Sequence, residues 1–528
     1  MNDQSFWVSV DDLKAYANVF YGLIPGGVSV LDDTDSDIQV PNNINSFLWG
    51  QYVVPTEGGV WQKSSWQNIR NINYFMTHYQ SVQAAEADVN IYVAEMRFFR
   101  ALEYFNKIQL LGDVPWLEVD LNVDSEELYG PKMKRNQVFQ KIIEDLDFAI
   151  QWLPEAGSEE ANRLNKDIAR HVKARFCLNE GTHYKYHDEL EYASEAEKWL
   201  QMAATESDKL ITSGRYEIYN TGHPQEDYFN MYRIDDKSDL KEAVLYVDYK
   251  TNIREHNMAA AGREAGCGFS KSFVESFLCS DGLPISLSNK YLGDETMRKE
   301  TANRDPRLKQ LILTNDFPTN VTDDLKDSTF VVNEDEFITQ HCFTGYRPIK
   351  GFNPIYSQAL YMKSSFDGIA YRYAETLLIN AEAKAELNTI TNADLDRTVN
   401  QLRDRVGMPH LTVNVGFTDP KWPDWGYSLS PVLQEIRRER CIELAGEGFR
   451  FNDLKRWKAG KLLNNVLTYV GKRKPDGNLA IVYPNYTNPD LSYQAGKSRT
   501  WEDKMYLYPI PTGELQRNPQ LLPQNPGW

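Results

Sequence analysis

The sequence predicts a mostly α-helical protein with an irregular, loop-rich middle. In residues 1–215, and again after residue 366, apolar residues recur at steps of three and four, which is the spacing of a helix that buries one face. Residues 216–365 instead carry many turn-forming residues and one short strand-like run at 243–247. We therefore expect an N-terminal helical part (1–215), a loop-rich middle (216–365) and a C-terminal part (366–528) that together form one compact unit.

The N-terminal part contains four predicted helices. In the first, apolar residues from Ile91 to Ile108 share one face, and Gly112 ends the helix. The others cover 136–153, 166–183 and a stretch from 193 to Gly214. Small residues alternate with large ones on their faces, which favours antiparallel helix pairs as in tetratricopeptide solenoids. No clean period of about 34 residues accompanies them, so the pattern alone leaves the repeat fold open.

In the C-terminal part, helices are predicted over 369–387, 392–406 and 431–444. The last 20 residues hold five prolines, so we expect an extended, clamped tail rather than a helix.

Composition excludes several classes of function. The net charge of −18 disfavours a nucleic-acid partner and direct docking on an anionic membrane. The five cysteines are odd in number and form no C-x-x-C pair, so neither a disulfide framework nor a thiolate zinc site is expected. No apolar run of about 18 residues is present to span a membrane.

Motifs for catalysis or cofactor binding are missing from the sequence. It contains no H-E-x-x-H, Walker A or G-x-S-x-G pattern, so we predict no enzyme and no cofactor. His183 and His187 could share a metal, but structural histidines are the favoured interpretation without a third ligand nearby. The acidic run 32–37 lacks the glycine and glutamate of a calcium loop and is interpreted as an acidic surface loop.

Four segments carry a family resemblance. They are 97–115 (RFFRALEYF through LGDVP), 371–383 (YRYAETLLINAEA), 439–457 (ERCIELAGEGFR with DLKRW), and 507–511 (LYPIP) with the closing Asn-Pro pairs. In this order they resemble the SusD/RagB family of Bacteroidota. The charged residues of these motifs are interpreted as a paired structural network at helix ends rather than a ligand site: Glu375, Glu439, Arg440, Glu443 and Arg450.

The resemblance implies a tetratricopeptide-like helical scaffold with irregular loops packed on it. It also implies a lipoprotein on the outer face of the outer membrane, seated on a SusC-like TonB-dependent transporter. Such proteins capture glycans, sometimes peptides, without catalysis. The family's lipid-bearing N-terminal cysteine has no counterpart here, since the first cysteine is Cys177. We therefore expect the printed chain to lack the export signal and the anchor, which would be its membrane attachment.

Aromatic residues supply the candidate glycan contacts, because flat rings pack against the C–H faces of sugars. Trp49, Tyr52, Trp61 and Trp66 lie within 18 residues, around a turn at Gly58-Gly59. Trp49 and Trp61 are the preferred loop candidates, although Trp49 is equally well interpreted as filling a gap in the scaffold. Trp66 fits better on the core face of the following helix.

Further candidates come from three later segments. Tyr232 and Arg233 follow a predicted helix, and Tyr346 and Tyr356 lie in a Gly/Pro loop. Trp422 and Trp425 lie in an aromatic loop, for which a face toward the transporter is the alternative interpretation. A capture protein must release its cargo, so a Kd of about 1 μM to 1 mM is expected. A peptide binder, a glycoside hydrolase and a structural adaptor remain as alternatives.

Overall fold

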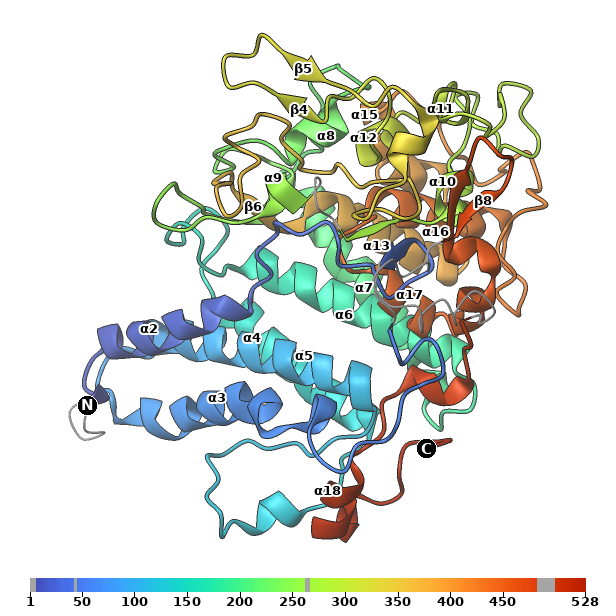
Figure 1. Ribbon diagram of the computed structural model, residues 1–528. Helices are drawn as coiled ribbons and strands as arrows, with labels where there is room; N and C mark the ends of the chain where they lie inside the picture. The colour runs from blue at the N-terminus through green and yellow to red at the C-terminus, as the bar shows by residue number, and fades with distance from the viewer. Residues whose placement is uncertain (1–5, 42–44, 262–265, 482–498) are drawn as a thin grey trace. The chain divides into compact units, whose positions relative to one another are not determined.

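The computed structural model describes residues 6–41, 45–261, 266–481 and 499–528 of the chain (Figure 1). These residues form two compact units, each built from segments that are far apart in sequence. Unit 1 comprises residues 1–25, 52–176 and 502–528, and unit 2 comprises residues 26–51 and 177–501. The division into three successive parts stays a prediction.

Unit 1 is organised around the long helix α4 (Glu86–Leu111), which packs against three other helices. These are α2 (Val10–Asn18), α3 (Gln67–His78) and α5 (Arg135–Trp152), which run alongside it in Figure 1. The face of α4 that carries Phe98, Phe105 and Ile108 is fully or almost fully buried. Gly112 follows with φ 74°, a conformation that favours glycine, and the helix ends there.

The tail of unit 1 contains the short helix α18 (Thr512–Arg517). The predicted tail without a helix is therefore wrong over these six residues, although the rest of the tail is irregular. Helix α6 (Lys166–Tyr186) begins in unit 1, and its residues from 177 onward belong to unit 2.

Unit 2 contains α7 (Ala196–Ser213) and α16 (Pro431–Glu443), both packed against the almost entirely buried α13 (Tyr373–Glu386). Asn380 in α13 donates from Nδ2 to the Ala204 carbonyl oxygen of α7, which ties these two helices together. Shorter helices complete the unit: α8 (Asp227–Met231), α9 (Met258–Ala261), α10 (Lys271–Ser276), α11 (Met297–Thr301), α12 (Arg307–Leu311), α14 (Asn392–Asp396), α15 (Val399–Arg405) and α17 (Arg450–Arg456).

The strands of unit 2 form antiparallel pairs: β1 (Gln39–Pro41) with β3 (Cys267–Phe269), β2 (Ala243–Val247) with β6 (Gly368–Arg372), β4 (Asn320–Val321) with β5 (Ser328–Thr329), and β7 (Val470–Arg473) with β8 (Leu479–Ile481). The pairs β1–β3 and β2–β6 join segments that are far apart in the sequence, whereas β4–β5 and β7–β8 join neighbouring segments. In the described residues each pair is a two-stranded sheet of its own.

Short 3-10 helices occur in both units: η1 (Val19–Leu23), η2 (Gly59–Trp61), η3 (Lys63–Trp66), η4 (Tyr79–Ser81), η5 (Glu126–Tyr129), η6 (Ala193–Glu195), η7 (Glu334–Phe337), η8 (Gly460–Asn464), η9 (Val466–Thr468), η11 (Asp503–Tyr506) and η12 (Pro519–Leu521).

Most predicted elements are confirmed. The four N-terminal helices correspond to α4, α5, α6 and α7, the run 243–247 is strand β2, and 431–444 is α16. Two predictions need correction. The segment 369–372 belongs to strand β6 rather than to the helix that follows it, and 392–406 is two helices, α14 and α15. In the described part of the chain, no helix is long and apolar enough to cross a membrane.

Candidate functional site

A group of half-exposed aromatic rings lies in unit 1, and we call it the aromatic surface: Tyr52, Trp61, Trp66, Tyr508 and Trp528. The ring of Tyr52 lies 5.8 Å from that of Tyr508 and 5.7 Å from that of Trp528, both edge-on. Trp61 and Trp66 form a second edge-on pair at 5.3 Å. Since edge-on rings support one another while leaving part of each uncovered, this arrangement suits contact with a flat apolar ligand face.

Two buried or half-buried lysines border these rings. Lys107 Nζ lies 5.0 Å from the centre of the Trp66 ring, and Lys504 Nζ lies 5.1 Å from that of Trp528. Burial lowers the pKa of Lys107. The lysines supply cation–π contacts that hold the two tryptophans in place.

The loop that carries Tyr52 and Trp61 is fastened by the C-terminal tail. The Thr512 backbone N–H donates to the Pro55 carbonyl oxygen at 3.0 Å, and that of Gly513 donates to the Thr56 carbonyl oxygen at 2.9 Å. A Cβ at position 513 would lie 2.7 Å from the Thr56 oxygen, so this approach requires glycine. Gly58 and Gly59 have φ of 85° and 60°, consistent with the predicted turn. The rings are therefore preorganised, which reduces the entropy lost on binding.

The other sequence-predicted residues lie in unit 2, and four of them are buried. The ring of Trp49 packs edge-on against Tyr469 at 5.7 Å, and Trp425 donates from Nε1 to Gln434. Tyr346 donates its hydroxyl to Glu300, and Tyr232 donates its hydroxyl to Glu447. These four side chains are at most 6% exposed, so none offers a ring face to solvent.

Three predicted residues of unit 2 retain exposed surface. Tyr356 is 52% exposed, whereas Trp422 is half-buried and donates from Nε1 to Glu435. The half-buried Arg233 guanidinium lies over the Phe229 ring at 5.3 Å. As ligand contacts all ten residues stay predictions. Of the predicted residues the structure pairs Trp61 with Trp66, whereas the ring of Tyr52 packs against Tyr508 and Trp528.

Sequence reasoning missed Tyr508 and Trp528. Both lie in the tail, which was interpreted only as a clamp. The sequence does contain a signal for them, because both aromatic residues lie in a Pro-rich extended segment. Such a segment packs against another part of the chain, and its rings can then join a surface there.

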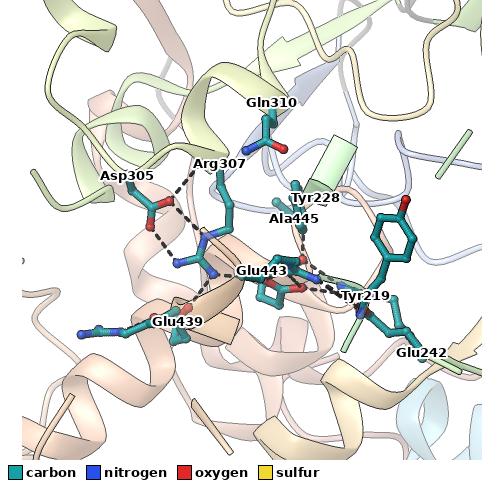
Figure 2. Close-up of polar contacts among 12 residues, drawn as sticks. Tyr219, Tyr228, Glu242, Asp305, Arg307, Gln310, Glu439, Glu443 and Ala445 are labelled. Carbon is teal, nitrogen blue, oxygen red and sulfur yellow. Dashed lines mark hydrogen bonds and ion pairs between the residues drawn. The ribbon is translucent and has the colours of Figure 1, made fainter. Parts of the chain in front are cut away.

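A buried ion network occupies the interior of unit 2 (Figure 2). Glu443 accepts from Arg405 and Arg372 at 2.6 Å each and from Arg307 at 3.1 Å. Although burial alone raises the pKa of Glu443, these guanidinium groups hold it well below its usual range. Every carboxylate drawn in Figure 2 accepts at least one bond from a basic group, so this cluster is structural.

The predicted network of charged motif residues is confirmed for four of its five members. Glu439 and Glu443 both accept from Arg307. Arg440 pairs with Asp453, and Arg450 pairs with Asp37. The fifth member, Glu375, is buried in α13.

The acidic run 32–37 is not simply a surface loop, which corrects the expectation. Asp33 is 1% exposed and accepts from the backbone N–H groups of Gly446 and Arg450 at 2.7 and 2.9 Å. Burial raises its pKa to about 7. Asp37 is also buried and forms a two-bond pair with the Arg450 guanidinium. Through these hydrogen bonds and this ion pair, the two buried aspartates hold the segment from Gly446 to Arg450 in place.

Within the four described stretches, no group of three or more His, Cys, Asp or Glu side chains is arranged to hold a metal ion. His183 and His187 are buried, with ring centroids 4.1 Å apart, and His187 Nε2 bonds the Lys455 carbonyl oxygen.

Comparisons with known proteins agree on one family. The sequence profile described as the SusD family matches residues 212–528. The chain is 25% identical over 456 residues to SusD-like protein P2 of Formosa agariphila, covering 84% of this chain and 75% of that protein. It is 23% identical over 538 residues to SusD-like protein P25 of the same organism, covering 96% and 88%.

Solved structures show the same fold. A SusD-like protein from Bacteroides fragilis matches with a TM-score of 0.76 and 23% identity, over 100% of this chain and 99% of that one. A SusD-like carbohydrate-binding protein from the same species has a TM-score of 0.73 and 20% identity over 98% and 100%. A laminarin-binding SusD-like protein has a TM-score of 0.58 and 19% identity over 99% and 100%. These matches confirm the predicted mostly α, tetratricopeptide-like fold.

Proposed function

This chain belongs to the SusD family, and we propose that it captures glycans at the cell surface without cleaving them. Two of the similar structures are described as carbohydrate-binding and laminarin-binding, which supports a sugar ligand for this chain. We further propose that it is an outward-facing outer-membrane lipoprotein and delivers its cargo to a SusC-like TonB-dependent transporter.

The observation that carries the proposal is the aromatic surface of unit 1. Its rings are partly buried and form two edge-on groups. Tyr52 and Trp61 belong to a loop that backbone hydrogen bonds fasten to the tail, and Tyr508 and Trp528 belong to the tail itself. Sugar rings present apolar C–H faces, and a rigid aromatic group contacts them at a small entropic cost. Tyr52, Trp61 and Trp528 are the proposed contacts.

The state of the acidic residues supports capture without cleavage. A glycosidase requires two carboxyl groups at a defined spacing, one of them with a raised pKa that allows it to donate a proton. By contrast, basic groups bond Glu443 (Figure 2) and Glu447, and the pKa values of both carboxyl groups are lowered.

The test is calorimetry of the full chain against soluble neutral polysaccharides, with reducing ends measured on the same samples. We expect saturable binding without new reducing ends. Trp61→Ala and Tyr52→Ala should each weaken binding about twofold to tenfold, because an aromatic contact contributes about 0.5–1.5 kcal/mol.

Trp152→Ala is the matched control, because Trp152 is also a half-exposed tryptophan of unit 1 and is not part of the aromatic surface. Equal loss in Trp152→Ala and Trp61→Ala would contradict the assignment of the site. New reducing ends would contradict capture without cleavage. If the chain bound peptides and no glycan, peptides would replace glycans as the ligand class.

The transporter partnership has its own test. A tagged full chain, expressed with its export signal in a Bacteroidota host, should co-purify with a SusC-like transporter from the outer membrane. Recovery in a soluble fraction without a transporter would contradict this part of the proposal.

A further inference from the structure

We propose that a cavity around Arg304 in unit 2 binds the anionic substituent of an acidic sugar, either a carboxylate or a sulfate ester. This inference rests on the proposed capture of glycans and specifies a charge class for part of the ligand. The cavity has a volume of about 300 Å³. Since small-molecule pockets begin at about that size, it fits one sugar unit with its substituent rather than a length of polymer.

The walls of the cavity come from four segments of unit 2 that are braced against one another. The Ser280 backbone N–H donates to the Asn303 carbonyl oxygen at 2.8 Å, and that of Asp305 donates to the Leu278 carbonyl oxygen at 2.9 Å. Gln310, in α12, donates from Nε2 to the Pro224 carbonyl oxygen at 3.1 Å, which fixes the segment before α8. The cavity is therefore preformed, and a ligand need not order a loop in order to bind.

Arg304 lines this cavity and is only 4% exposed. Its guanidinium donates to three main-chain carbonyl oxygens, those of Glu300, Val274 and Phe277, at 2.8 to 3.1 Å. These bonds use three of the five donors of an arginine, and Nε has no partner among the residues that the structure describes. Among the described residues Arg304 forms no ion pair. Its guanidinium lies 5.3 Å from the centre of the Tyr291 ring, and the carboxylate that interacts with it electrostatically, Glu300, is bonded by Lys271.

The nearest acidic side chain of the cavity does not neutralise Arg304. Both carboxylate oxygens of Asp305 accept from the Arg307 guanidinium, at 3.1 and 2.7 Å. Figure 2 shows the Asp305 carboxylate turned toward Arg307. Asp305 is therefore already paired with Arg307, and among the described residues no carboxylate forms an ion pair with Arg304.

A second cation lies at the cavity. Lys309 lines it, and its side chain is 41% exposed. Lys309 Nζ lies 3.7 Å from a carboxylate oxygen of Asp316, whose side chain is 55% exposed. A pair of this kind is weak, so Lys309 can turn toward a bound anion at little cost. One buried arginine and one mobile lysine thus give a positive field in a chain whose net charge is −18.

Hydroxyl and amide groups complete the lining. Ser280, Asn303 and Gln225 are exposed at the cavity and offer donors and acceptors to sugar hydroxyls. Oxyanions paired with arginine form stronger hydrogen bonds than neutral groups do. The lining therefore selects a sugar that carries an oxyanion over a neutral one.

The test is calorimetry of the full chain with three probes of similar length: a uronic-acid oligosaccharide, a sulfated galactan oligosaccharide and a neutral glucan oligosaccharide. Ser280→Trp would fill the cavity from an exposed position and should abolish the preference for acidic probes. Lys309→Gln should weaken the binding of the acidic probes about threefold to tenfold and leave the binding of the neutral probe unchanged. Lys326→Gln is the control, because it also removes a surface lysine that pairs with an aspartate, Asp324, but one that does not line the cavity.

Preference for either acidic probe, lost in Ser280→Trp and kept in Lys326→Gln, supports the inference. Preference for the uronic-acid probe would identify the bound group as a carboxylate, and preference for the sulfated probe would identify it as a sulfate ester. Equal binding of acidic and neutral probes, or an acidic preference that survives Ser280→Trp, would overturn it while leaving glycan capture intact. Failure of all three probes, together with failure of the neutral polysaccharides above, would overturn both proposals.

Discussion

Arg304 and Arg307 lie three residues apart and are nearly equally buried, at 4% and 1% exposed, yet their surroundings are opposite. Arg307 donates to Asp305, Glu439 and Glu443. Although burial alone lowers the pKa of Arg307, these carboxylates hold it well above its usual range. Among the described residues Arg304 donates only to main-chain carbonyls and forms no ion pair, and burial lowers its pKa. The first region is a closed network, whereas the second retains capacity to bind an anion.

The largest expected effect is in the closed network. Glu443→Gln would leave three guanidinium groups short of a buried counter-charge, so we expect a loss of about 3–5 kcal/mol in the free energy of unfolding. Urea denaturation measures it. Glu217→Gln, which breaks an exposed pair with Lys241, is the control and should change stability by less than about 1 kcal/mol. Equal losses in the two variants would show that the network is not closed.

Arg304→Met should reduce the free energy of unfolding by less than Glu443→Gln does. It leaves main-chain carbonyls without a donor, but it leaves no buried charge without its counter-charge. We expect about 1–3 kcal/mol in the same denaturation experiment. A loss larger than that of Glu443→Gln would mean that Arg304 belongs to the network after all.

The contributions of the two regions to stability should also respond differently to acid pH. The pKa values of Glu443, Glu447 and Glu386 are lowered in the fold, in each case by basic groups that outweigh burial. Their contribution to stability is therefore full above the unfolded value of about 4.3 and is lost as the pH falls toward the folded values. The Tm of the wild type should fall from pH 5 to pH 3, with a smaller slope in Glu443→Gln. Arg304→Met should run parallel to the wild type, and a flattened curve for that variant would contradict the comparison.

The smallest expected effect is that of Tyr232→Phe. It removes one buried hydrogen bond to Glu447 and leaves that carboxylate with Lys350 and Arg372, so we expect a loss of about 0.5–1.5 kcal/mol. Glycan binding, measured by the same calorimetry, should not change, because Tyr232 is 5% exposed. A marked loss of binding with unchanged stability would restore Tyr232 as a ligand contact.

Local pattern sufficed for much of the fold. The periodicity of α4 and the glycine after it are both properties of neighbouring residues, and so is the run that forms β2. The segment 369–372 was assigned to a helix because its apolar residues continue the pattern of α13. Its actual partner is β2, more than a hundred residues earlier, and a local window contains no information on that pairing.

The candidate site was less predictable, because burial depends on distant partners. Trp49 and Trp61 look alike in sequence, yet Tyr469 covers Trp49 while Trp61 retains exposed surface. Asp33 looks like part of a solvated acidic run, and its partners at Gly446 and Arg450 lie more than 400 residues away. The sequence identifies which residue types can contact a glycan, whereas the fold decides which of them are accessible.

The fastening of the tail has a consequence for synthesis. Unit 1 needs residues 502–528, since the Tyr508 N–H bonds the Leu110 carbonyl oxygen and Asn525 Nδ2 bonds that of Leu111. Chains are made from the N-terminus, so the end of α4 emerges from the ribosome 414 residues before its partner Asn525. Until then the loop of Tyr52 and Trp61 lacks the strap at Thr512 and Gly513, and its rings have no fixed geometry. On the proposed function, the aromatic surface is therefore complete only after the last residues of the chain have been made.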